Sequence, residues 1–167
     1  MSSPASGYQH IALDLARVET GQDGRLGLHV VSCSMLPLLR PGDLVQVRRM
    51  PVEALRQGDV IVVNSAGNPI THRLVMVDAQ GWHTKGDSCT FADPPVPAEA
   101  IWGRVVSVER GDTCLDLQNR RWSLVNRCVG ALSCWQVQVA RHLGGIRLAG
   151  WPFRVMSRLV LEVSLRV

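Results

Sequence analysis

Three kinds of side chain that together support acyl transfer follow one another along this chain: a serine, a histidine and carboxylates. Ser34 stands in Ser-Met-Leu-Pro, which Arg-Pro-Gly-Asp follows after a short gap, and we predict that it lies on a turn entering a strand. His72 stands in the strand-like run Ile-Thr-His-Arg-Leu-Val, and Asp87 and Asp93 come later. A hydroxyl nucleophile, an imidazole base and an orienting carboxylate are the groups that acyl-transfer chemistry requires.

Two side chains compete for the role of general base, His72 and Lys85, and Lys85 is the only lysine in the chain. A lysine ordinarily titrates near pKa ~10.4, so burial has to lower its pKa by about three units before it can act as a base at neutral pH. A histidine ordinarily titrates near pKa ~6.5 and needs no such help. We therefore expect His72 to be the base, with Lys85 as the second candidate.

In this interpretation His72 takes the hydroxyl proton as Ser34 attacks a peptide carbonyl, and then passes the proton to the leaving amine. Water hydrolyses the acyl-enzyme that results. The backbone amide of Ser34 is a candidate donor for the oxyanion. Met35 is a candidate substrate contact and is equally suited to shape a buried turn, and both interpretations stay open at this point.

The motifs around these residues resemble the signal peptidase I family, which is related to the self-cleaving repressors. The resemblance runs from about Val31 to Val106 and comprises, in order, S-M-x-P, G-D, G-D-V-I, H-R, T-K-G-D, a further Asp and G-R-V. A histidine directly before the arginine is similar to the endoplasmic-reticulum and archaeal subgroup of that family, whereas most bacterial members have a lysine there.

The resemblance implies a serine endopeptidase without a cofactor that cleaves signal or leader peptides. It implies that the peptide or protein substrate is bound in extended form along a sheet edge beside the serine. The third catalytic residue of this subgroup lies six residues beyond the Gly-Asp pair, which favours Asp93 over Asp87, since a turn aspartate is a sufficient explanation of Asp87. Ser32 resembles a second oxyanion donor of the family.

Short β-branched runs, separated by Gly-Asp, Asn-Pro and Pro-Pro turns, predict a mainly β fold in which a signal-peptidase-like antiparallel β domain precedes a C-terminal amphipathic helical tail. We divide the chain into a loosely structured lead (1–26), a catalytic β domain (27–119) and a basic tail (120–167). The strands are predicted at 44–47, 60–63, 70–77, 81–84, 101–108 and 114–117.

The tail carries most of the positive charge. Residues 1–119 have ten Lys and Arg against thirteen Asp and Glu, whereas residues 120–167 have eight Arg against one Glu. Within the tail, 161–167 alternates at period two and predicts a final strand. An amphipathic helix is predicted from apolar residues at helical spacing: Leu124, Cys128, Leu132, Trp135, Val139 and Leu143.

Three uses compete for this helical stripe. Packing on the catalytic domain is the favoured one. Contact with an anionic membrane surface comes second, because tryptophan and arginine suit an interfacial helix. Nucleic acid is an unlikely partner, because no recognised nucleic-acid motif is present.

Features that the sequence lacks restrict the expected location of the protein and its expected ligands. The chain has no secretory signal and no apolar run of about 18 residues, which predicts a cytoplasmic or peripherally membrane-associated protein without a transmembrane anchor. The five cysteines form no C-x-x-C pair, and His72, His83 and Cys89 fit no usual zinc spacing, so we expect no metal.

Two other function classes remain as alternatives. A regulatory module that cleaves its own chain is the first, and the lack of an N-terminal helix-turn-helix weighs against it. A non-catalytic peptide-binding relative is the second, and its binding would survive the substitution Ser34→Ala unchanged.

Overall fold

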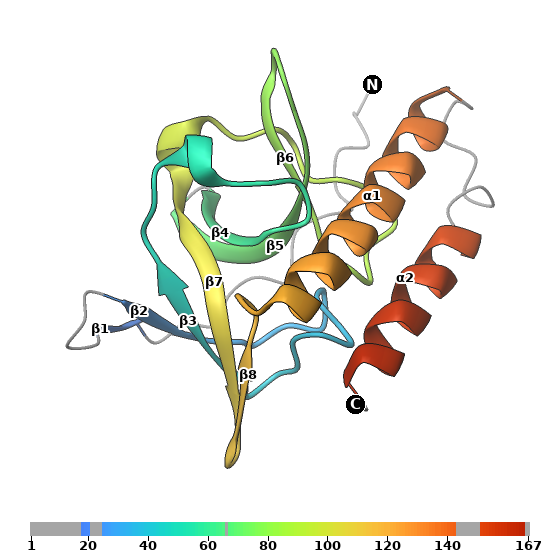
Figure 1. Cartoon of the computed structure of the whole chain (residues 1–167). Helices are drawn as coiled ribbons and strands as arrows, with labels where there is room; N and C mark the ends of the chain where they lie inside the picture. The colour runs from blue at the N-terminus through green and yellow to red at the C-terminus, as the bar shows by residue number, and fades with distance from the viewer. Residues whose placement is uncertain (1–17, 21–24, 66, 143–150, 166–167) are drawn as a thin grey trace, which may run out of the picture.

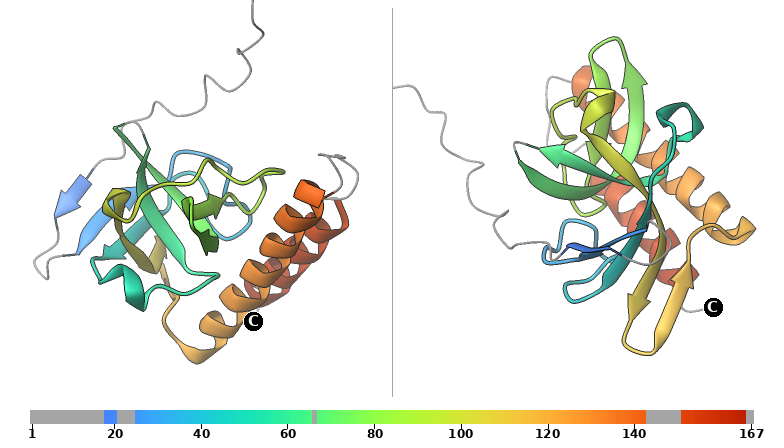
Figure 2. Two further views of the ribbon diagram at one scale, coloured as in Figure 1. Left: turned by 90° about the horizontal axis from the view of Figure 1, so that it is seen from above. Right: turned by 90° about the vertical axis from the view of Figure 1, so that its left-hand side faces the viewer.

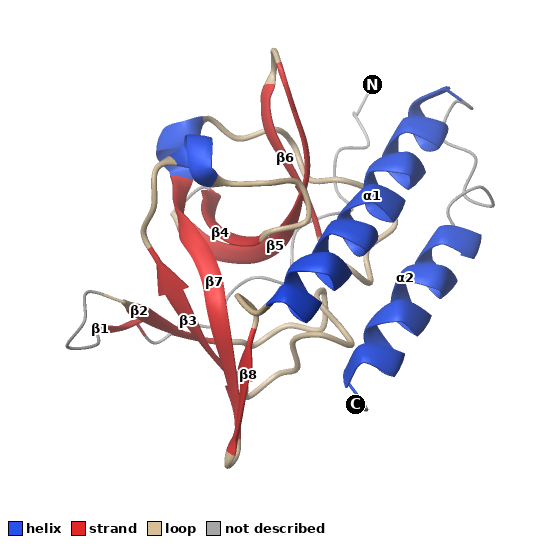
Figure 3. Cartoon of the chain, in the orientation of Figure 1, coloured by secondary structure: helices blue, strands red, loops and turns tan. Residues whose placement is uncertain are grey.

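A twisted antiparallel β-sheet and a pair of C-terminal helices make up the protein, as its computed structural model shows (Figure 1). The structure describes residues 18–20, 25–65, 67–142 and 151–165. The helices lie side by side on one side of the sheet (Figures 2 and 3). This arrangement confirms the predicted class, a mainly antiparallel β domain with a helical C-terminal region.

The described residues form eight strands in one sheet, in the order β1-β2-β3-β7-β4-β5-β6, and β8 pairs with β7. The long strand β7 lies at the centre of the sheet and joins β3 to β4. The strands are β1 (Val18–Thr20), β2 (Leu26–His29), β3 (Leu44–Arg48), β4 (Val60–Ser65), β5 (Asn68–Asp78), β6 (Gly81–Lys85), β7 (Ile101–Arg110) and β8 (Thr113–Asp116). Two short 3-10 helices, Val52–Ala54 and Ala98–Ala100, precede β4 and β7.

Each of the six predicted strands is present within a few residues of its expected ends. β1 and β2 were not predicted as strands from the sequence. β1 falls inside the predicted lead and pairs with β2, while 1–17 and 21–24, the rest of what precedes Arg25, lie outside the described residues.

The two Gly-Asp motifs build the same turn at the entrances to β3 and β4. Asp43 Oδ2 accepts a hydrogen bond from the Arg40 amide at 2.8 Å, and Asp59 Oδ2 accepts one from the Arg56 amide at 2.8 Å. The preceding glycines have φ values of 92° for Gly42 and 98° for Gly58, which L side chains rarely adopt. Each motif thus reverses the chain and starts a strand.

The main core lies between the sheet and the two helices. It contains valines from β3, β4 and β7, together with Met35, Leu38 and Leu39 from the turn that carries Ser34. Trp122 and Val129 of helix α1 (Arg120–His142) and Leu161 of helix α2 (Trp151–Leu165) complete it. The tail therefore packs on the β domain, as the favoured interpretation of the sequence predicted.

Helix α1 is present as predicted, but the side that it buries is a different one. Leu124 and Trp135 of the predicted apolar stripe are 64% and 62% exposed, and Cys128 is exposed as well. The buried side is largely polar or small: Asn126, Gly130, Ser133 and Gln136 lie on it between Trp122 and Val137. Hydrogen bonds and close backbone contact, rather than apolar area alone, orient this helix. Leu143 lies outside the described residues.

The final strand predicted over 161–167 is wrong. α2 continues as a helix to Leu165, and 166–167 lie outside the described residues. Leu161 and Leu165, which suggested alternation, are four residues apart and both pack on the main core from one side of a helix. A short apolar run that fits both periods is decided by its tertiary contacts. Within the described residues, no helix is long and apolar enough to cross a membrane.

Helix α1 passes so close to the turn before β4 that the two backbones are in contact. A Cβ on Gly130 would come within 2.4 Å of Gly58 Cα, and a Cβ on Gly58 would come within 2.2 Å of the Asn126 carbonyl oxygen. Real Cβ atoms essentially never approach so closely. Two glycines that face each other therefore set the distance between the helix and the sheet.

We expect Gly130→Ala to destabilise the protein by about 1–3 kcal/mol, because the added methyl group forces the helix away from the turn. Helix propensity alone would give the opposite sign, a gain of about 1 kcal/mol. Thermal or urea unfolding measures the difference, with Ala131→Gly at the neighbouring exposed position as a control that reports propensity only. A stabilised Gly130→Ala variant would contradict the close approach.

Candidate active site

Ser34 lies on a tight turn between β2 and β3, and buried apolar side chains of this turn hold it on the main core. Met35, Leu38 and Leu39 are at most 2% exposed, and the Leu39 amide donates to the Met35 carbonyl at 3.0 Å. The Leu36-Pro37 peptide bond within the turn is cis. The buried side chains hold the turn, so that Ser34 itself remains only half-buried at the surface.

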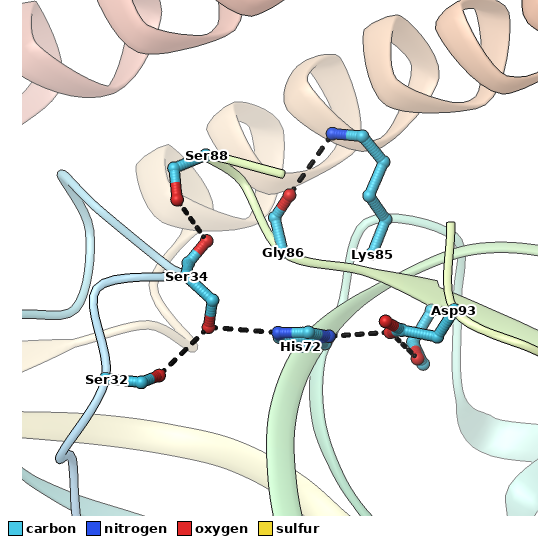
Figure 4. A network of polar contacts seen from close by, with 8 residues as sticks. Ser32, Ser34, His72, Lys85, Gly86, Ser88 and Asp93 are labelled. Atoms are coloured by element: carbon cyan, nitrogen blue, oxygen red, sulfur yellow. Dashed lines mark hydrogen bonds and ion pairs between the residues drawn. The ribbon is translucent and has the colours of Figure 1, made fainter. Parts of the chain in front are cut away.

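His72 lies in β5 opposite Ile61 of β4 and is 7% exposed. Its Nε2 is 3.0 Å from Ser34 Oγ, and its Nδ1 is 2.6 Å from Asp93 Oδ2 (Figure 4). A carboxylate only accepts hydrogen bonds, so the proton of a neutral His72 belongs on Nδ1. Nε2 then presents its lone pair to the Ser34 hydroxyl. The serine, the histidine and Asp93 thus form one continuous chain of hydrogen bonds.

Asp93 is held in place from β6. Thr84 Oγ1 donates to Asp93 Oδ2 at 2.6 Å, and the Asp93 amide donates to the Thr84 carbonyl at 2.8 Å. Three residues before Asp93 in the same loop, the Thr90 carbonyl accepts a hydrogen bond from Gln136 Nε2 of α1 at 3.0 Å. Both the sheet and the helix therefore position the carboxylate that meets His72.

Asp87 has a different partner. Its two carboxylate oxygens accept hydrogen bonds from Arg73 Nε at 2.7 Å and Arg73 Nη2 at 2.8 Å, and both side chains are almost fully buried. Arg73 Nη1 also donates to the Gly58 carbonyl at 2.7 Å and to Asn126 Oδ1 at 2.8 Å. This buried network joins β5, the Gly-Asp turn, the Asp87 segment and helix α1.

The segment that follows Asp87 is attached directly to the serine turn. Ser88 Oγ donates to the carbonyl oxygens of Cys33 and Ser34 at 2.8 Å each, and its amide donates to the Ser34 carbonyl at 2.9 Å. Gly86 leaves the room that this approach requires. A Cβ there would lie 2.7 Å from the Ser34 carbonyl oxygen and 3.0 Å from His72 Nε2.

Ser32 lies beside the nucleophile candidate, as the sequence suggested. Its Oγ is 3.1 Å from Ser34 Oγ, and because the Ser34 proton points to His72, the Ser32 hydroxyl is the donor in this pair. In the described part of the chain the structure gives the Ser34 amide no acceptor. A backbone amide and a hydroxyl are thus both available next to Ser34 Oγ.

Met35 and Lys85 lie apart from this arrangement. Met35 is 2% exposed and belongs to the main core, which matches the interpretation that it shapes a buried turn. Lys85 is 1% exposed, and its Nζ donates to the Gly86 carbonyl at 3.2 Å. In Figure 4 its side chain extends toward a helix, whereas His72 lies between Ser34 and Asp93.

A cysteine close to the site is a poor competitor for the nucleophile role. Burial raises the pKa of the Cys89 thiol above its ordinary value, and the negative charge of Asp93 raises this pKa further. The thiol therefore stays protonated at neutral pH, whereas the nucleophilic form of a cysteine is the thiolate. Ser34 is the hydroxyl that contacts the imidazole.

A cavity of about 270 Å³ adjoins the other side of the Asp93 loop. Its walls include Phe91, Asp93 and, from α1, Val137 and Ala140. Neither Ser34 nor His72 lines it. The cavity therefore does not open onto the Ser34 hydroxyl.

Ser88, Thr84, Asn126 and Gln136 were not identified from the sequence. Thr84 falls inside the T-K-G-D motif, so that motif was a usable signal for it. The others carry no local signal: Asn126 and Gln136 lie in a helix more than thirty residues beyond Asp93, and only the tertiary structure brings them to the site.

Residues 3–106, well over half of the chain, match the Peptidase S24-like family, and the chain belongs to that family. This match places the chain in the broader superfamily that S24-like peptidases share with the signal peptidases. The peptidases of this superfamily are of the serine type. No curated protein and no solved structure matches the chain.

Proposed function

We propose that this protein is a serine endopeptidase of the Ser-His type, the endoplasmic-reticulum and archaeal subgroup of signal peptidases, and that it cleaves an extended signal or leader segment of another polypeptide. The observation that carries the proposal is the contact between His72 Nε2 and Ser34 Oγ at 3.0 Å, with Asp93 on the opposite ring nitrogen at 2.6 Å. Both distances lie within the range in which general-base catalysis operates.

In the proposed mechanism Ser34 Oγ attacks the carbonyl carbon of the scissile peptide bond while His72 Nε2 takes the hydroxyl proton. Asp93 stabilises the imidazolium that forms and keeps the ring oriented. The imidazolium then protonates the leaving amine nitrogen, the carbon-nitrogen bond breaks, and an acyl-enzyme on Ser34 remains. Water attacks this ester with His72 again as the base, which releases the acid and restores the Ser34 hydroxyl.

The negative charge of each tetrahedral intermediate develops on the former carbonyl oxygen. The Ser34 amide and the Ser32 hydroxyl are the donors that we assign to this oxyanion, since both flank Ser34 Oγ. Their turn is anchored by the core below it and by Ser88 beside it, so they need little reorganisation during the reaction.

The open edge of β5 is the proposed site for the extended substrate. β4 pairs with β5 along 68–73, but β6 pairs with β5 only from Arg73 onward. In the described sheet, the stretch 68–72 therefore has one unpaired edge, which ends at His72. An added strand can hydrogen-bond to such an edge, and this would place its backbone beside Ser34. Val31, which is 46% exposed next to Ser32, is an apolar candidate contact.

The proposal is tested by incubating the purified protein with a library of extended peptides, signal and leader sequences among them, and locating the cuts by mass spectrometry. We expect cleavage at a single bond in a subset of peptides, with small side chains just before the cut. Tight binding without cleavage would indicate a non-catalytic peptide-binding protein. Fragments of the protein itself, formed at a rate independent of its concentration, would indicate a self-cleaving regulator.

The choice of His72 as base makes a separate prediction about Lys85. We expect Lys85→Met to keep kcat within about tenfold of the wild type, because Lys85 is bonded to the Gly86 carbonyl and takes no proton in the proposed mechanism. Cleavage kinetics and circular dichroism on the same sample distinguish lost chemistry from lost folding. A folded Lys85→Met variant without activity would move the role of base to Lys85.

A further inference from the structure

Apolar side chains gather on the outer surface of the two C-terminal helices. The described residues include nine large hydrophobic side chains that are strongly exposed, and six of them lie on α1 and α2. These six define what we call the outer face of the helical hairpin: Leu124, Trp135, Val155, Met156, Leu159 and Val163. The other three, Val31, Val77 and Phe91, lie in separate parts of the β domain.

The six residues share one side of the hairpin. Leu124 and Trp135 are eleven residues, about three helical turns, apart and lie opposite the buried Val129 and Ser133. On α2, Leu159 and Val163 are four residues apart and lie opposite the buried Leu161. Because Val129 and Leu161 both belong to the main core, both helices turn these apolar sides away from the sheet.

The helices run side by side and antiparallel (Figures 1 and 2). Arg121 at the start of α1 donates from Nη2 to the carbonyl of Ser164 near the end of α2 at 2.6 Å. Leu124 is therefore near the end of α2 that carries Val163, and Trp135 is near the end that carries Met156. The apolar side chains form one patch rather than two.

Arginines border this patch. Arg120 and Arg127 are exposed on α1, and Arg158 is exposed on α2, where it forms an ion pair with Glu162 at 2.8 Å. Glu162 is the one acidic residue against eight arginines in residues 120–167, so the segment carries a net charge of +7. Arg141, Arg147, Arg154 and Arg166 are part of this charge, but the structure does not describe their side chains.

We infer that the outer face of the helical hairpin binds the surface of an anionic lipid bilayer. An apolar patch with a tryptophan at one end and arginines at its borders matches an interfacial helix, whose apolar side enters the acyl-chain boundary while its cations meet lipid phosphates. Long arginine side chains reach the headgroups while their stems cover apolar surface. The charge is what selects lipid over a second copy of this chain, since two copies would bring like charges together.

The inference is tested by co-sedimentation of the full chain with vesicles of phosphatidylcholine alone and of phosphatidylcholine with 30% phosphatidylglycerol, a composition chosen for the test. We expect binding to the anionic vesicles at least tenfold tighter, weakened by added salt, because each basic residue near such a surface contributes about fivefold in affinity. A blue shift of tryptophan fluorescence that Trp135→Phe removes would locate the contact.

Variants at exposed positions distinguish the contribution of the apolar side chains to vesicle binding from that of the arginines. The double substitution Trp135→Gln with Leu159→Gln is expected to lower vesicle affinity by more than tenfold, and Arg120→Gln with Arg127→Gln by about twentyfold or more. Val77→Gln and Arg49→Gln, exposed residues of the β domain, serve as matched controls and should leave binding unchanged. Circular dichroism checks that each variant is folded.

Three outcomes would overturn the inference. The first is equal binding to both kinds of vesicle with no effect of salt. The second is no vesicle binding together with a dimer that Trp135→Gln dissociates, which would assign the patch to a second copy. The third is retained vesicle binding in both double variants. None of these measurements depends on peptidase activity.

Discussion

Replacing Ser34 with alanine is expected to lower kcat for peptide cleavage by roughly 10⁴- to 10⁶-fold, because the reaction loses the atom that attacks the carbonyl. The free energy of unfolding should change by less than about 1 kcal/mol, since Ser34 is half-buried and the turn is held by core contacts and by the Leu39 amide, which donates to the Met35 carbonyl. Steady-state kinetics on a substrate from the peptide library measures the loss, and urea unfolding checks the fold.

A neighbouring serine provides the matched control. Ser32→Ala removes one oxyanion donor and leaves the nucleophile, so we expect a smaller loss in kcat, of about 10²- to 10³-fold. The double variant Ser34→Ala with His72→Ala should be no slower than either single variant, because the two residues act as one unit. Full activity in Ser34→Ala would show that the nucleophile is elsewhere in the chain.

The second large effect concerns stability. Asp87→Ala is expected to lower the free energy of unfolding by about 3–5 kcal/mol, because it leaves the Arg73 guanidinium buried without a counter-charge. Urea unfolding measures it. Glu162→Ala is the matched control: it breaks an exposed ion pair with Arg158, and such pairs contribute only about 0.3–0.5 kcal/mol.

A combined substitution distinguishes charge burial from general disruption. Arg73→Met with Asp87→Leu removes both charges, so part of the lost stability should return. The recovery should be incomplete, because Asn126 Oδ1 and the Gly58 carbonyl lose the donor that Arg73 supplied. Loss of stability no larger in Asp87→Ala than in Glu162→Ala would contradict the buried network.

The sequence allowed the sheet to be predicted well because its signals are local. Gly42-Asp43 and Gly58-Asp59 form turns through their own backbone amides and positive φ angles, and the β-branched runs between the turns are the strands. The ordered motifs also selected Ser34, His72 and Asp93, and the structure places both Ser34 and Asp93 within hydrogen-bond distance of His72. The catalytic roles of these residues remain predictions that the substitutions above test.

For the tail, the sequence predicted the helical periodicity of α1 but not which side of that helix is buried. Which side of α1 is buried depends on Asn126 meeting Arg73, Gly130 meeting Gly58 and Gln136 meeting the Thr90 carbonyl, and all of these partners are distant in sequence. Hydrophobic periodicity selected Leu124 and Trp135 instead, since it assumes that the most apolar side is the buried one. The false strand at 161–167 has a different cause: its short apolar run fits both periods, and only the contacts of Leu161 and Leu165 with the main core decide between them.

The turn that carries Ser34 packs on residues that are synthesised much later than the turn itself. Met35, Leu38 and Leu39 share their core with Trp122, Val129 and Leu161, so this core is incomplete until helix α2 has formed. A nascent chain that already exposes Ser34, His72 and Asp93 therefore lacks the support that holds them in register. Translation order thus delays the assembly of this site until both C-terminal helices have been synthesised.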